Sequence, residues 1–381
     1  MKLVFITNLV HHHQIPVADE FYKILGDNYK YIATEPLPDW LIKGGYDPDI
    51  DRPYIVRPYT NQQLLHEAIE LASNADAVII GDAPEFYVTD RINAGKLTFR
   101  YSERIFKSRP WYMTTPRGWI NLYKNHIQYR NKPLYMLCAS AYTAKDFNTI
   151  GAYKNKCFKW GYMTKVDTYN PVADANEKAE CSENKLRIMW CARFLKWKHP
   201  ELPVKLAERL KEKGYHFELN MFGSGEELES TKDLVSKLSI ADCVNFCGNR
   251  SNDEILAEMR QHDVFLFTSD RNEGWGAVLN EAMSSKCAVV GSNKIGSVPY
   301  LIIDGFNGRI FQSENIDSLE EKVVFLIDNP NIRKQLSENA YLTMRDVWSP
   351  QNAVRNFFRL VEALTTRDHS LIPSIGPCSK A

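Results

Sequence analysis

The sequence predicts two α/β domains in tandem, each built on a parallel, doubly wound sheet. Its 381 residues exceed what a single core usually organises. Short, continuously apolar runs alternate with helical patterns, as in parallel sheets covered on both faces. A polar stretch over 166–185 interrupts this alternation. We therefore expect a first domain over 1–170, a linker over 171–185 and a second domain over 186–348.

The first domain contains three runs typical of buried parallel strands. These are Leu3 to Ile6, Ala77 to Ile80 and Tyr135 to Leu137, and the segments 61–73 and 141–150 between and after them have helical periodicity. Strands that alternate with helices indicate a parallel sheet.

The second domain repeats this alternation more regularly. We expect strands at 186–192, 216–222, 244–247, 264–268 and 287–290, and helices at 201–213, 228–238, 252–261 and 276–285. Loops at the carboxyl ends of such strands are where open α/β sheets bind ligands.

The chain ends with one more helix and a short tail. Ser349 can cap a helix over 350–366, with Pro350 in its first turn. The remaining tail, 367–381, is predicted to be disordered.

Composition excludes several classes of protein. The 47 basic and 47 acidic residues cancel, so we expect no nucleic-acid partner. The eight cysteines never have the two-residue spacing of a zinc or redox motif, which favours reduced thiols in a cytoplasmic protein. No apolar run reaches the length of a transmembrane span.

The most informative segment, 273–281, reads Glu-Gly-Trp-Gly-Ala-Val-Leu-Asn-Glu and lies between two predicted strands. Its glycines leave backbone N–H groups accessible, and the start of the next helix favours an anion such as phosphate. Glu281 follows Gly276 by five residues, about 7 to 8 Å along a helix. That distance suits a nucleotide with its diphosphate at the glycines and its ribose at Glu281. The predicted ligand-binding residues are Gly274, Trp275, Gly276, Ala277, Val278 and Glu281.

Charged residues upstream complete a candidate site. Arg193 can bind a diphosphate with two hydrogen bonds, and Lys198 adds a point charge. Together they would offset the charge of a departing nucleoside diphosphate, so we expect neither a metal nor a cofactor. Glu273 could accept hydrogen bonds from paired hydroxyl groups of the ligand.

Two further loops contain glycines after predicted strands. Gly223 and Gly248 permit close approach of the backbone to a ligand. The second loop, with Asn249 and Arg250, is a reasonable place for a nucleobase.

These motifs together resemble the group 1 glycosyltransferases, family 4 in the carbohydrate-enzyme classification. The resemblance rests on the order of Arg193 to Lys198, Gly223 to Gly225, Gly248, Glu273 to Glu281 and Ile295 to Ser297. It is clear over 186–348 and weaker before. It implies a GT-B fold, in which two Rossmann-like domains face a central cleft and helix 350–366 crosses back to the first domain.

The resemblance also implies an activity and residue roles. The family transfers a sugar with retention of configuration from a nucleotide-diphosphate sugar, without a metal. A saccharide or lipid-linked saccharide would be the acceptor, in synthesis of surface polysaccharide or another glycoconjugate. Arg193 and Lys198 would bind the diphosphate, Glu281 the ribose and Glu273 the sugar. The chain departs from the family pattern at Tyr300, where an acidic residue is usual.

The first loop departs too, because His11, His12 and His13 stand where the family has glycines. Adjacent side chains point apart, which disfavours a metal site. We expect His13 to contact the sugar or the acceptor, and His12 and Asp82 to lie on the acceptor side. An ordinary turn cap is an equal interpretation of Asp82.

The segment 104–132 contains seven basic residues, no acidic residue and five Trp or Tyr residues. Two interpretations stay open. It is either a peripheral contact with the inner face of a membrane or a basic wall that meets a charged acceptor.

Two other functions fit the same scaffold. One is a nucleotide-sugar epimerase, which acts on the donor without an acceptor. The other is a subunit that binds the nucleotide sugar but has lost catalysis. Release of nucleoside diphosphate only when an acceptor is present would distinguish transfer from both.

Overall fold

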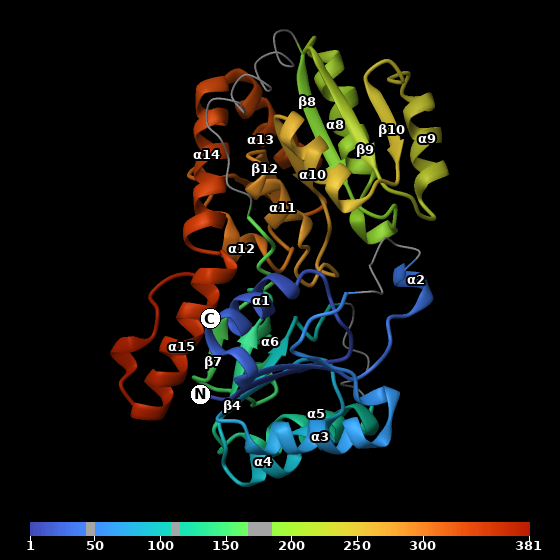
Figure 1. Cartoon of the computed structure of the whole chain (residues 1–381). Coiled ribbons are helices and arrows are strands. Elements are labelled where there is room, and N and C mark those ends of the chain that lie inside the picture. Colours follow the sequence, from blue (N-terminus) through green and yellow to red (C-terminus); the bar gives the residue numbers. More distant parts are fainter. Residues whose placement is uncertain (43–49, 108–114, 167–184) are drawn as a thin grey trace. The chain divides into compact units, whose positions relative to one another are not determined.

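The computed structural model describes residues 1–42, 50–107, 115–166 and 185–381 (Figure 1). The chain forms two compact units: unit 1 comprises Met1–Lys165 and Val347–Ala381, and unit 2 comprises Val166–Asp346. The predicted linker at 171–185 lies almost entirely outside the described residues.

Unit 1 is built on a seven-stranded parallel sheet of order β3-β2-β1-β4-β5-β6-β7. Its strands are β1 (Leu3–Thr7), β2 (Tyr29–Ala33), β3 (Ile55–Val56), β4 (Ala77–Ile80), β5 (Thr98–Ser102), β6 (Leu134–Cys138) and β7 (Cys157–Lys159). All residues of β1 and β4 are buried, as expected of continuously apolar strands covered on both faces.

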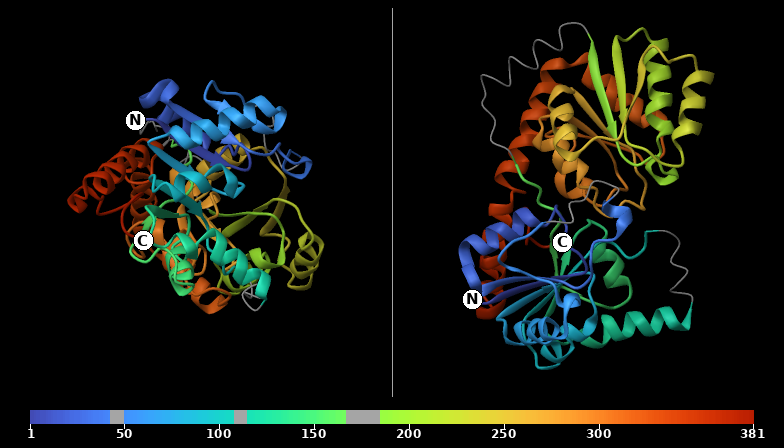
Figure 2. Two further views of the ribbon diagram at one scale, coloured as in Figure 1. Left: turned by 90° about the horizontal axis from the view of Figure 1, so that it is seen from below. Right: turned by 45° about the vertical axis from the view of Figure 1, so that its right-hand side comes forward.

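Helices cover both faces of this sheet (Figures 1 and 2). The helices of unit 1 are α1 (Ile15–Leu25), α2 (Asp39–Ile42), α3 (Gln62–Asn74), α4 (Thr89–Asn93), α5 (Pro116–Asn125), α6 (Thr143–Thr149) and α15 (Pro350–Thr366). Phe357 of α15 packs against Phe21 of α1 and Phe99 of β5, with ring centroids 5.4 and 5.0 Å apart. The C-terminal helix is therefore part of the core of unit 1. As predicted, the side chain of Ser349 caps it.

The prediction that the tail 367–381 is disordered is wrong. Its end pairs with the edge strand β7: Lys159 N–H donates to Ser379 O and Cys378 N–H donates to Lys159 O, both at 2.7 Å. Cys378 and Ser379 are buried. The sequence pattern does not reveal this role, because the hydrogen bonds with β7 are made by backbone groups that any residue carries.

Removal of Gly376–Ala381 should lower the melting temperature by about 5–10 °C, because it strips several hydrogen bonds from a sheet edge and exposes its core. Thermal unfolding followed by circular dichroism measures this. Ile375→Ser is the matched control, since that side chain is already 66% exposed. A deletion variant that melts with the wild type would show that the tail does not stabilise unit 1.

Unit 2 contains a six-stranded parallel sheet of order β10-β9-β8-β11-β12-β13. Its strands are β8 (Leu186–Cys191), β9 (Phe217–Phe222), β10 (Val244–Gly248), β11 (Val264–Phe267), β12 (Ala288–Ser292) and β13 (Arg309–Phe311). The helices are α8 (Glu201–Glu212), α9 (Leu228–Lys237), α10 (Asn252–Gln261), α11 (Val278–Ser284), α12 (Val298–Leu301), α13 (Ile316–Asp328) and α14 (Pro330–Asp346). The predicted pair of Rossmann-like, parallel-sheet domains is confirmed.

Each sheet has a point where the strand order reverses. In unit 1, β1 lies between β2 and β4, and in unit 2, β8 lies between β9 and β11. Ligands of open α/β sheets bind outside the carboxyl ends of the strands at such points. Within the described part of the chain, no helix is long and apolar enough to span a bilayer.

Candidate functional site

The loops that follow β8, β9, β10 and β11 in unit 2 are tied together by backbone hydrogen bonds. Phe194 N–H donates to Ser224 O at 2.8 Å, Gly223 N–H to Gly248 O at 2.9 Å, and Asp270 N–H to Trp197 O at 3.0 Å. The sequence-predicted motifs around Arg193, Gly223, Gly248 and Glu273 therefore lie at one edge of one sheet.

The glycines after β9 are required by this packing. Gly223 has φ +127°, and a Cβ there would lie 2.1 Å from the carbonyl oxygen of Ala192. A Cβ at Gly225 would lie 2.4 Å from the carbonyl oxygen of Phe194. The sequence attributed Gly223 to close approach of a ligand, but its close neighbour is the loop that carries Arg193.

The loop after β10 is more open. A Cβ at Gly248 would meet nothing within 4 Å. Asn249 donates a side-chain hydrogen bond to Ser224 Oγ at 3.0 Å, and Arg250 is exposed. The assignment of this loop to a nucleobase stays a prediction.

Lys198 and Glu273 form an ion pair whose two side chains are 12% and 10% exposed. Ser269 Oγ also donates to Glu273 Oε2, at 2.9 Å. Arg193 is exposed, and its side chain makes none of the ion pairs found among the described residues. One cation of the predicted pair is thus held by a carboxylate, while the other faces solvent.

Glu281 lies in α11 and is 8% exposed. Burial raises the pKa of its carboxyl group to about 7, against a smaller lowering by Asn252, whose Nδ2 donates to Glu281 Oε1 at 3.0 Å. Burial also raises the pKa of the Cys191 thiol to about 12, and Glu281 adds to this shift while Lys198 opposes it. The charges of Glu281 and Lys198 therefore both influence Cys191, the last residue of β8.

Sequence reasoning missed Asn252. Its signal was the capping box of Ser251 and Glu254, which fixes the start of α10 and places Asn252 at the first helical position.

The glycine segment differs from its predicted geometry. The indole of Trp275 is fully buried, and its Nε1 donates to Asn280 Oδ1 at 2.9 Å. The residue has no exposed surface, and its carbonyl oxygen accepts a hydrogen bond from Ser297 Oγ at 2.6 Å, so its predicted contact with a ligand stays a prediction. Gly276 has φ +82°, and a Cβ there would lie 2.2 Å from the ring of Phe267. The helix predicted from 276 accordingly begins at Val278.

The neighbours of Gly276 stay candidates. Gly274 and Ala277 are buried and Val278 is half-buried. Their predicted contacts with a ligand are not decided by these burials.

His199 links the loop of Lys198 to the loop of Glu273. Its Nδ1 lies 2.9 Å from Glu201 Oε1, and its Nε2 lies 3.6 Å from Asp270 Oδ2. Burial would lower the pKa of this imidazole, but the neighbouring carboxylates of Asp270 and Glu201 raise it to about 9. His199, Asp270 and Glu314 also have potential metal-ligand atoms within 4.8 Å of one another. The raised pKa makes His199 a cation at neutral pH, and this cation joins the two loops.

The His199 contacts should stabilise unit 2 in a pH-dependent way. Its folded-state pKa lies above the ordinary 6.5, so this stabilisation is complete below about pH 6.5 and is lost as the pH rises through about 9. Melting temperatures of wild type and His199→Gln should therefore differ at pH 6 and converge at pH 10. His369→Gln is the control, because that side chain is exposed. A pH-independent difference would contradict the ionic role.

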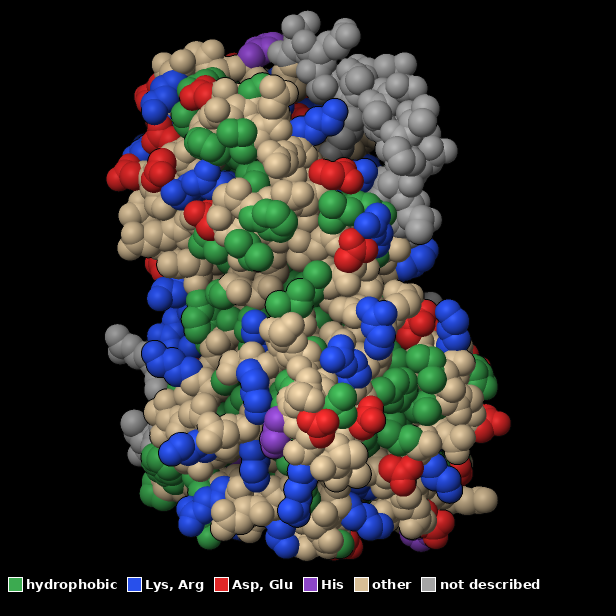
Figure 3. Space-filling model, turned by 90° about the vertical axis from the view of Figure 1, so that its left-hand side faces the viewer, with side chains coloured by type: hydrophobic (Ala, Val, Ile, Leu, Met, Phe, Trp, Pro, Cys, Tyr) green, Lys and Arg blue, Asp and Glu red, His purple; other side chains and the backbone are tan. Residues whose placement is uncertain are grey.

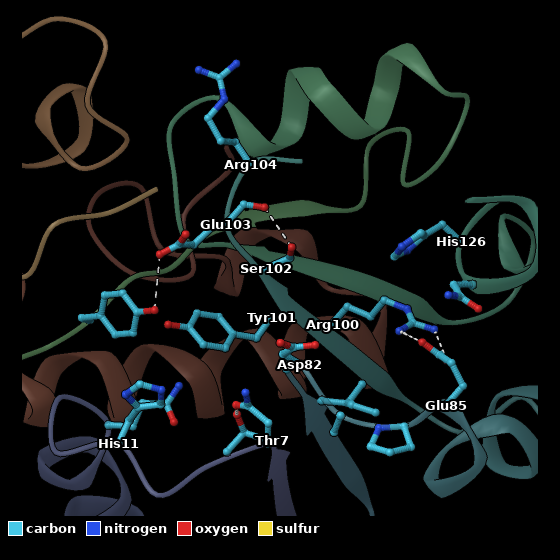
Figure 4. Close-up of a pocket in the computed structure, with 18 of the residues that line it drawn as sticks. Thr7, His11, Asp82, Glu85, Arg100, Tyr101, Ser102, Glu103, Arg104 and His126 are labelled. Atoms are coloured by element: carbon cyan, nitrogen blue, oxygen red, sulfur yellow. Dashed lines mark hydrogen bonds and ion pairs between the residues drawn. The ribbon is translucent and has the colours of Figure 1, made fainter. Parts of the chain in front are cut away.

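Unit 1 contains a cavity of about 660 Å³ at the carboxyl ends of β1, β4 and β5 (Figure 4). This is the point where the strand order reverses. Its lining includes Thr7, His11, Asp82, Arg100 and His126. The cavity has the size of a site for a small organic ligand.

Most charges around this cavity are paired. Arg100 donates from both terminal nitrogens to Glu85, each at 2.6 Å, and Lys107 pairs with Glu103. Arg104 Nη2 lies 3.4 Å from Asp146 Oδ1.

The three adjacent histidines are half-buried and neutral. Burial lowers the pKa of His11, lowers that of His12 to about 4 with help from His11, and lowers that of His13 further. His13 lies against Tyr162, with ring centroids 5.9 Å apart. His11, rather than the predicted His12 or His13, lines the cavity together with Asp82. The roles predicted for His12, His13 and Asp82 on the acceptor side stay predictions.

Comparison with known proteins now identifies the domain that unit 2 forms. The profile of glycosyl transferases group 1 matches residues 173–343, nearly all of unit 2. This chain carries a group 1 glycosyltransferase domain. An uncharacterised glycosyltransferase of Methanocaldococcus jannaschii is 26% identical over 203 residues, which cover 52% of this chain and 50% of that protein. The poly(glycerol-phosphate) alpha-glucosyltransferase of Bacillus subtilis is 28% identical over 150 residues, or 39% of this chain and 22% of that protein.

The chain spans about half the length, or less, of these curated relatives of its glycosyltransferase domain. Solved structures match over more of it. HepE of Anabaena, crystallised with UDP, aligns with a TM-score of 0.69 at 14% identity and covers 96% of this chain and 100% of its own. A glycosyltransferase of Rickettsia africae gives 0.68 at 16% identity, with 96% and 99% covered. These matches confirm the GT-B fold, while the expected central cleft stays a prediction.

Proposed function

We propose that this chain is a retaining glycosyltransferase that uses a nucleotide-diphosphate sugar bound by unit 2. The observation that carries the proposal is the Lys198–Glu273 ion pair, at the edge of the group 1 domain where Glu281 is also buried. HepE, which shares the fold, has been crystallised with UDP and with UDP-glucose.

The ion pair suggests how the donor is received. The diphosphate would draw Lys198 away from Glu273 and would also meet the exposed Arg193, so two cations would face the two phosphates. Glu273, released from Lys198, could then accept hydrogen bonds from hydroxyls of the sugar. Ligand binding would thus replace the Lys198–Glu273 contact with contacts from Lys198 and from Arg193 to the diphosphate.

The chemistry follows from this arrangement. The bond between the anomeric carbon and the phosphate oxygen breaks, and an acceptor oxygen forms the new bond on the same face of the sugar. The acceptor proton passes to the departing phosphate. Lys198 and Arg193 stabilise the negative charge on that group, which is the role a divalent ion has in other enzymes, so no metal is required.

The acceptor is a saccharide or lipid-linked saccharide, and the transfer is a step in the synthesis of a surface polysaccharide or another glycoconjugate. Unit 1 supports an approach to an anionic membrane from the cytoplasm. It carries 25 basic and 18 acidic residues, whereas unit 2 carries 22 and 29. Lys and Arg side chains are spread over the part of Figure 3 where unit 1 lies.

Helix α5 is the part of unit 1 best suited to that contact. Trp119, Ile120 and Tyr123 are 44%, 52% and 56% exposed, beside the exposed Arg117 and Lys124. Exposed aromatic side chains next to cations suit the interface of an anionic leaflet. Sedimentation with phosphatidylglycerol vesicles should capture the wild type and lose Trp119→Ser/Tyr123→Ser. Equal capture of both, or of neither, would remove the membrane from the proposal.

Turnover in the presence of EDTA tests the proposed reaction. UDP-, GDP-, ADP- and dTDP-sugars are incubated with candidate acceptors, and released nucleoside diphosphate is measured. We expect release that requires an acceptor and persists in EDTA. Conversion of the donor without an acceptor would indicate an epimerase, and donor binding without any turnover would indicate a non-catalytic subunit.

A further inference from the structure

Among the described residues that line the cavity of unit 1, one carboxylate is not neutralised by a cation. Asp82 follows β4, its side chain is exposed to the cavity, and it makes none of the hydrogen bonds or ion pairs found among the described residues. In Figure 4 it lies near the centre of the site, between Thr7, Tyr101 and Arg100.

Among the described residues, the cations that line the cavity with Asp82 already face other carboxylates through their terminal nitrogens. Both terminal nitrogens of Arg100 bind Glu85, and Lys107 binds Glu103. Arg104 approaches Asp146, and its guanidinium lies 4.7 Å from the ring centroid of Tyr142. A ligand bearing a phosphate or carboxylate would have to break one of these contacts and would meet the charge of Asp82.

A neutral imidazole and a buried guanidinium complete the lining. His126 is held by Tyr153, whose hydroxyl lies 2.9 Å from Nδ1, and burial together with the nearby Arg100 lowers the pKa of His126 to about 3. Its imidazole is therefore uncharged at neutral pH. Arg100 is only 5% exposed, and its Nε has no hydrogen-bond partner within the described residues. The neutral imidazole does not attract a negative charge, and the Nε–H of Arg100, whose charge already faces Glu85, can donate to a hydroxyl oxygen.

We propose that this cavity binds an uncharged sugar residue of the acceptor, and that Asp82 accepts hydrogen bonds from a pair of its hydroxyl groups. A sugar with a phosphate or carboxylate at that position is excluded. The inference rests on the proposed function, because it names the class of acceptor that the transferase uses. A carboxylate is the strongest acceptor available to hydroxyl donors. Asp82 therefore orients the bound sugar and selects an uncharged sugar over an anionic one.

Saturation-transfer difference NMR on the full chain tests the proposal. The probes are methyl α-D-glucopyranoside, methyl β-D-galactopyranoside and N-acetylglucosamine as neutral sugars, with glucuronate and glucose 6-phosphate as anionic ones. We expect saturation transfer to at least one neutral sugar and to neither anionic sugar. Asp82→Ala should weaken binding of the neutral sugar about tenfold or more, and Asp82→Asn should allow an anionic sugar to bind.

Asp90→Ala is the matched control, because Asp90 is an exposed carboxylate of unit 1 that does not line the cavity. Equal signals from neutral and anionic sugars, binding insensitive to Asp82→Ala, or no binding of any neutral sugar would each overturn the proposal. The thermal shift produced by UDP, GDP, ADP and dTDP is read on the same samples. A thermal shift with a nucleotide would leave the proposed use of the donor intact. The absence of a thermal shift with any of the four nucleotides would contradict the proposed function itself.

Discussion

Replacement of Lys198 by alanine should reduce glycosyl transfer about 100- to 1000-fold, the usual effect of removing one preorganised group that stabilises developing charge. The ammonium group stands beside Glu273 in the resting structure and, in the proposed reaction, beside the departing diphosphate. Its loss removes an interaction that strengthens as the bond to phosphate breaks. The fall should therefore appear mainly in kcat and less in KM.

Loss of Lys198 also leaves Glu273 buried without its cation, so stability must be measured in parallel. Lys198→Ala/Glu273→Gln restores a neutral interior and separates the two effects. The double variant should regain the melting temperature of the wild type but not its activity. Lys196→Ala is the matched control, because Lys196 is an exposed residue of the same short helix. A single variant with more than a tenth of normal turnover would contradict the role of Lys198.

Replacement of Glu281 by glutamine should change stability and donor binding in opposite directions. The folded-state pKa of Glu281 is raised from 4.5 to about 7, so the folded protein loses stability as the pH rises between these values. The full shift corresponds to about 3 kcal/mol at pH 8. Glutamine removes that cost, and the variant should melt at a higher temperature than the wild type at pH 8 but not at pH 4.5.

The same variant should bind the nucleotide about 10- to 100-fold more weakly, because a neutral amide accepts ribose hydroxyls less strongly than a carboxylate. Wild-type affinity should rise from pH 6 to pH 8, while that of Glu281→Gln should stay level. Melting curves and calorimetric titrations at both pH values measure the two effects. Glu229→Gln, at an exposed glutamate of α9, controls for a change of net charge. Unchanged nucleotide affinity would remove Glu281 from the site.

The sequence was informative where short, mainly apolar runs alternate with helical patterns. All five strands predicted in unit 2 exist, as do β1, β4 and β6 in unit 1. It failed at β2, which reads Tyr-Lys-Tyr-Ile-Ala, and at β5, which reads Thr-Phe-Arg-Tyr-Ser. Their polar residues interrupt the hydrophobic pattern, and the tertiary contacts that hold some of them, such as the pairing of Arg100 with Glu85, cannot be read from a local pattern.

The candidate site was predictable to a similar extent. The spacing of Glu273 and Glu281, and the basic residues upstream, located the edge of unit 2 correctly because parallel strands bring their carboxyl ends together. The pairing of Lys198 with Glu273 was not predictable, since 75 residues separate them. Nor was the enclosure of Trp275, because an aromatic residue beside glycines fits either a ligand or a core.

Titration calorimetry of UDP, GDP, ADP and dTDP in the presence of EDTA tests the central claim most directly. If Lys198 and Arg193 neutralise the diphosphate, at least one nucleotide binds the wild type without a metal. Its affinity then falls at least about tenfold in Lys198→Ala and in Arg193→Ala, as expected for loss of a charged contact. Binding that appears only after a divalent ion is added, or that both substitutions leave unchanged, would contradict the account.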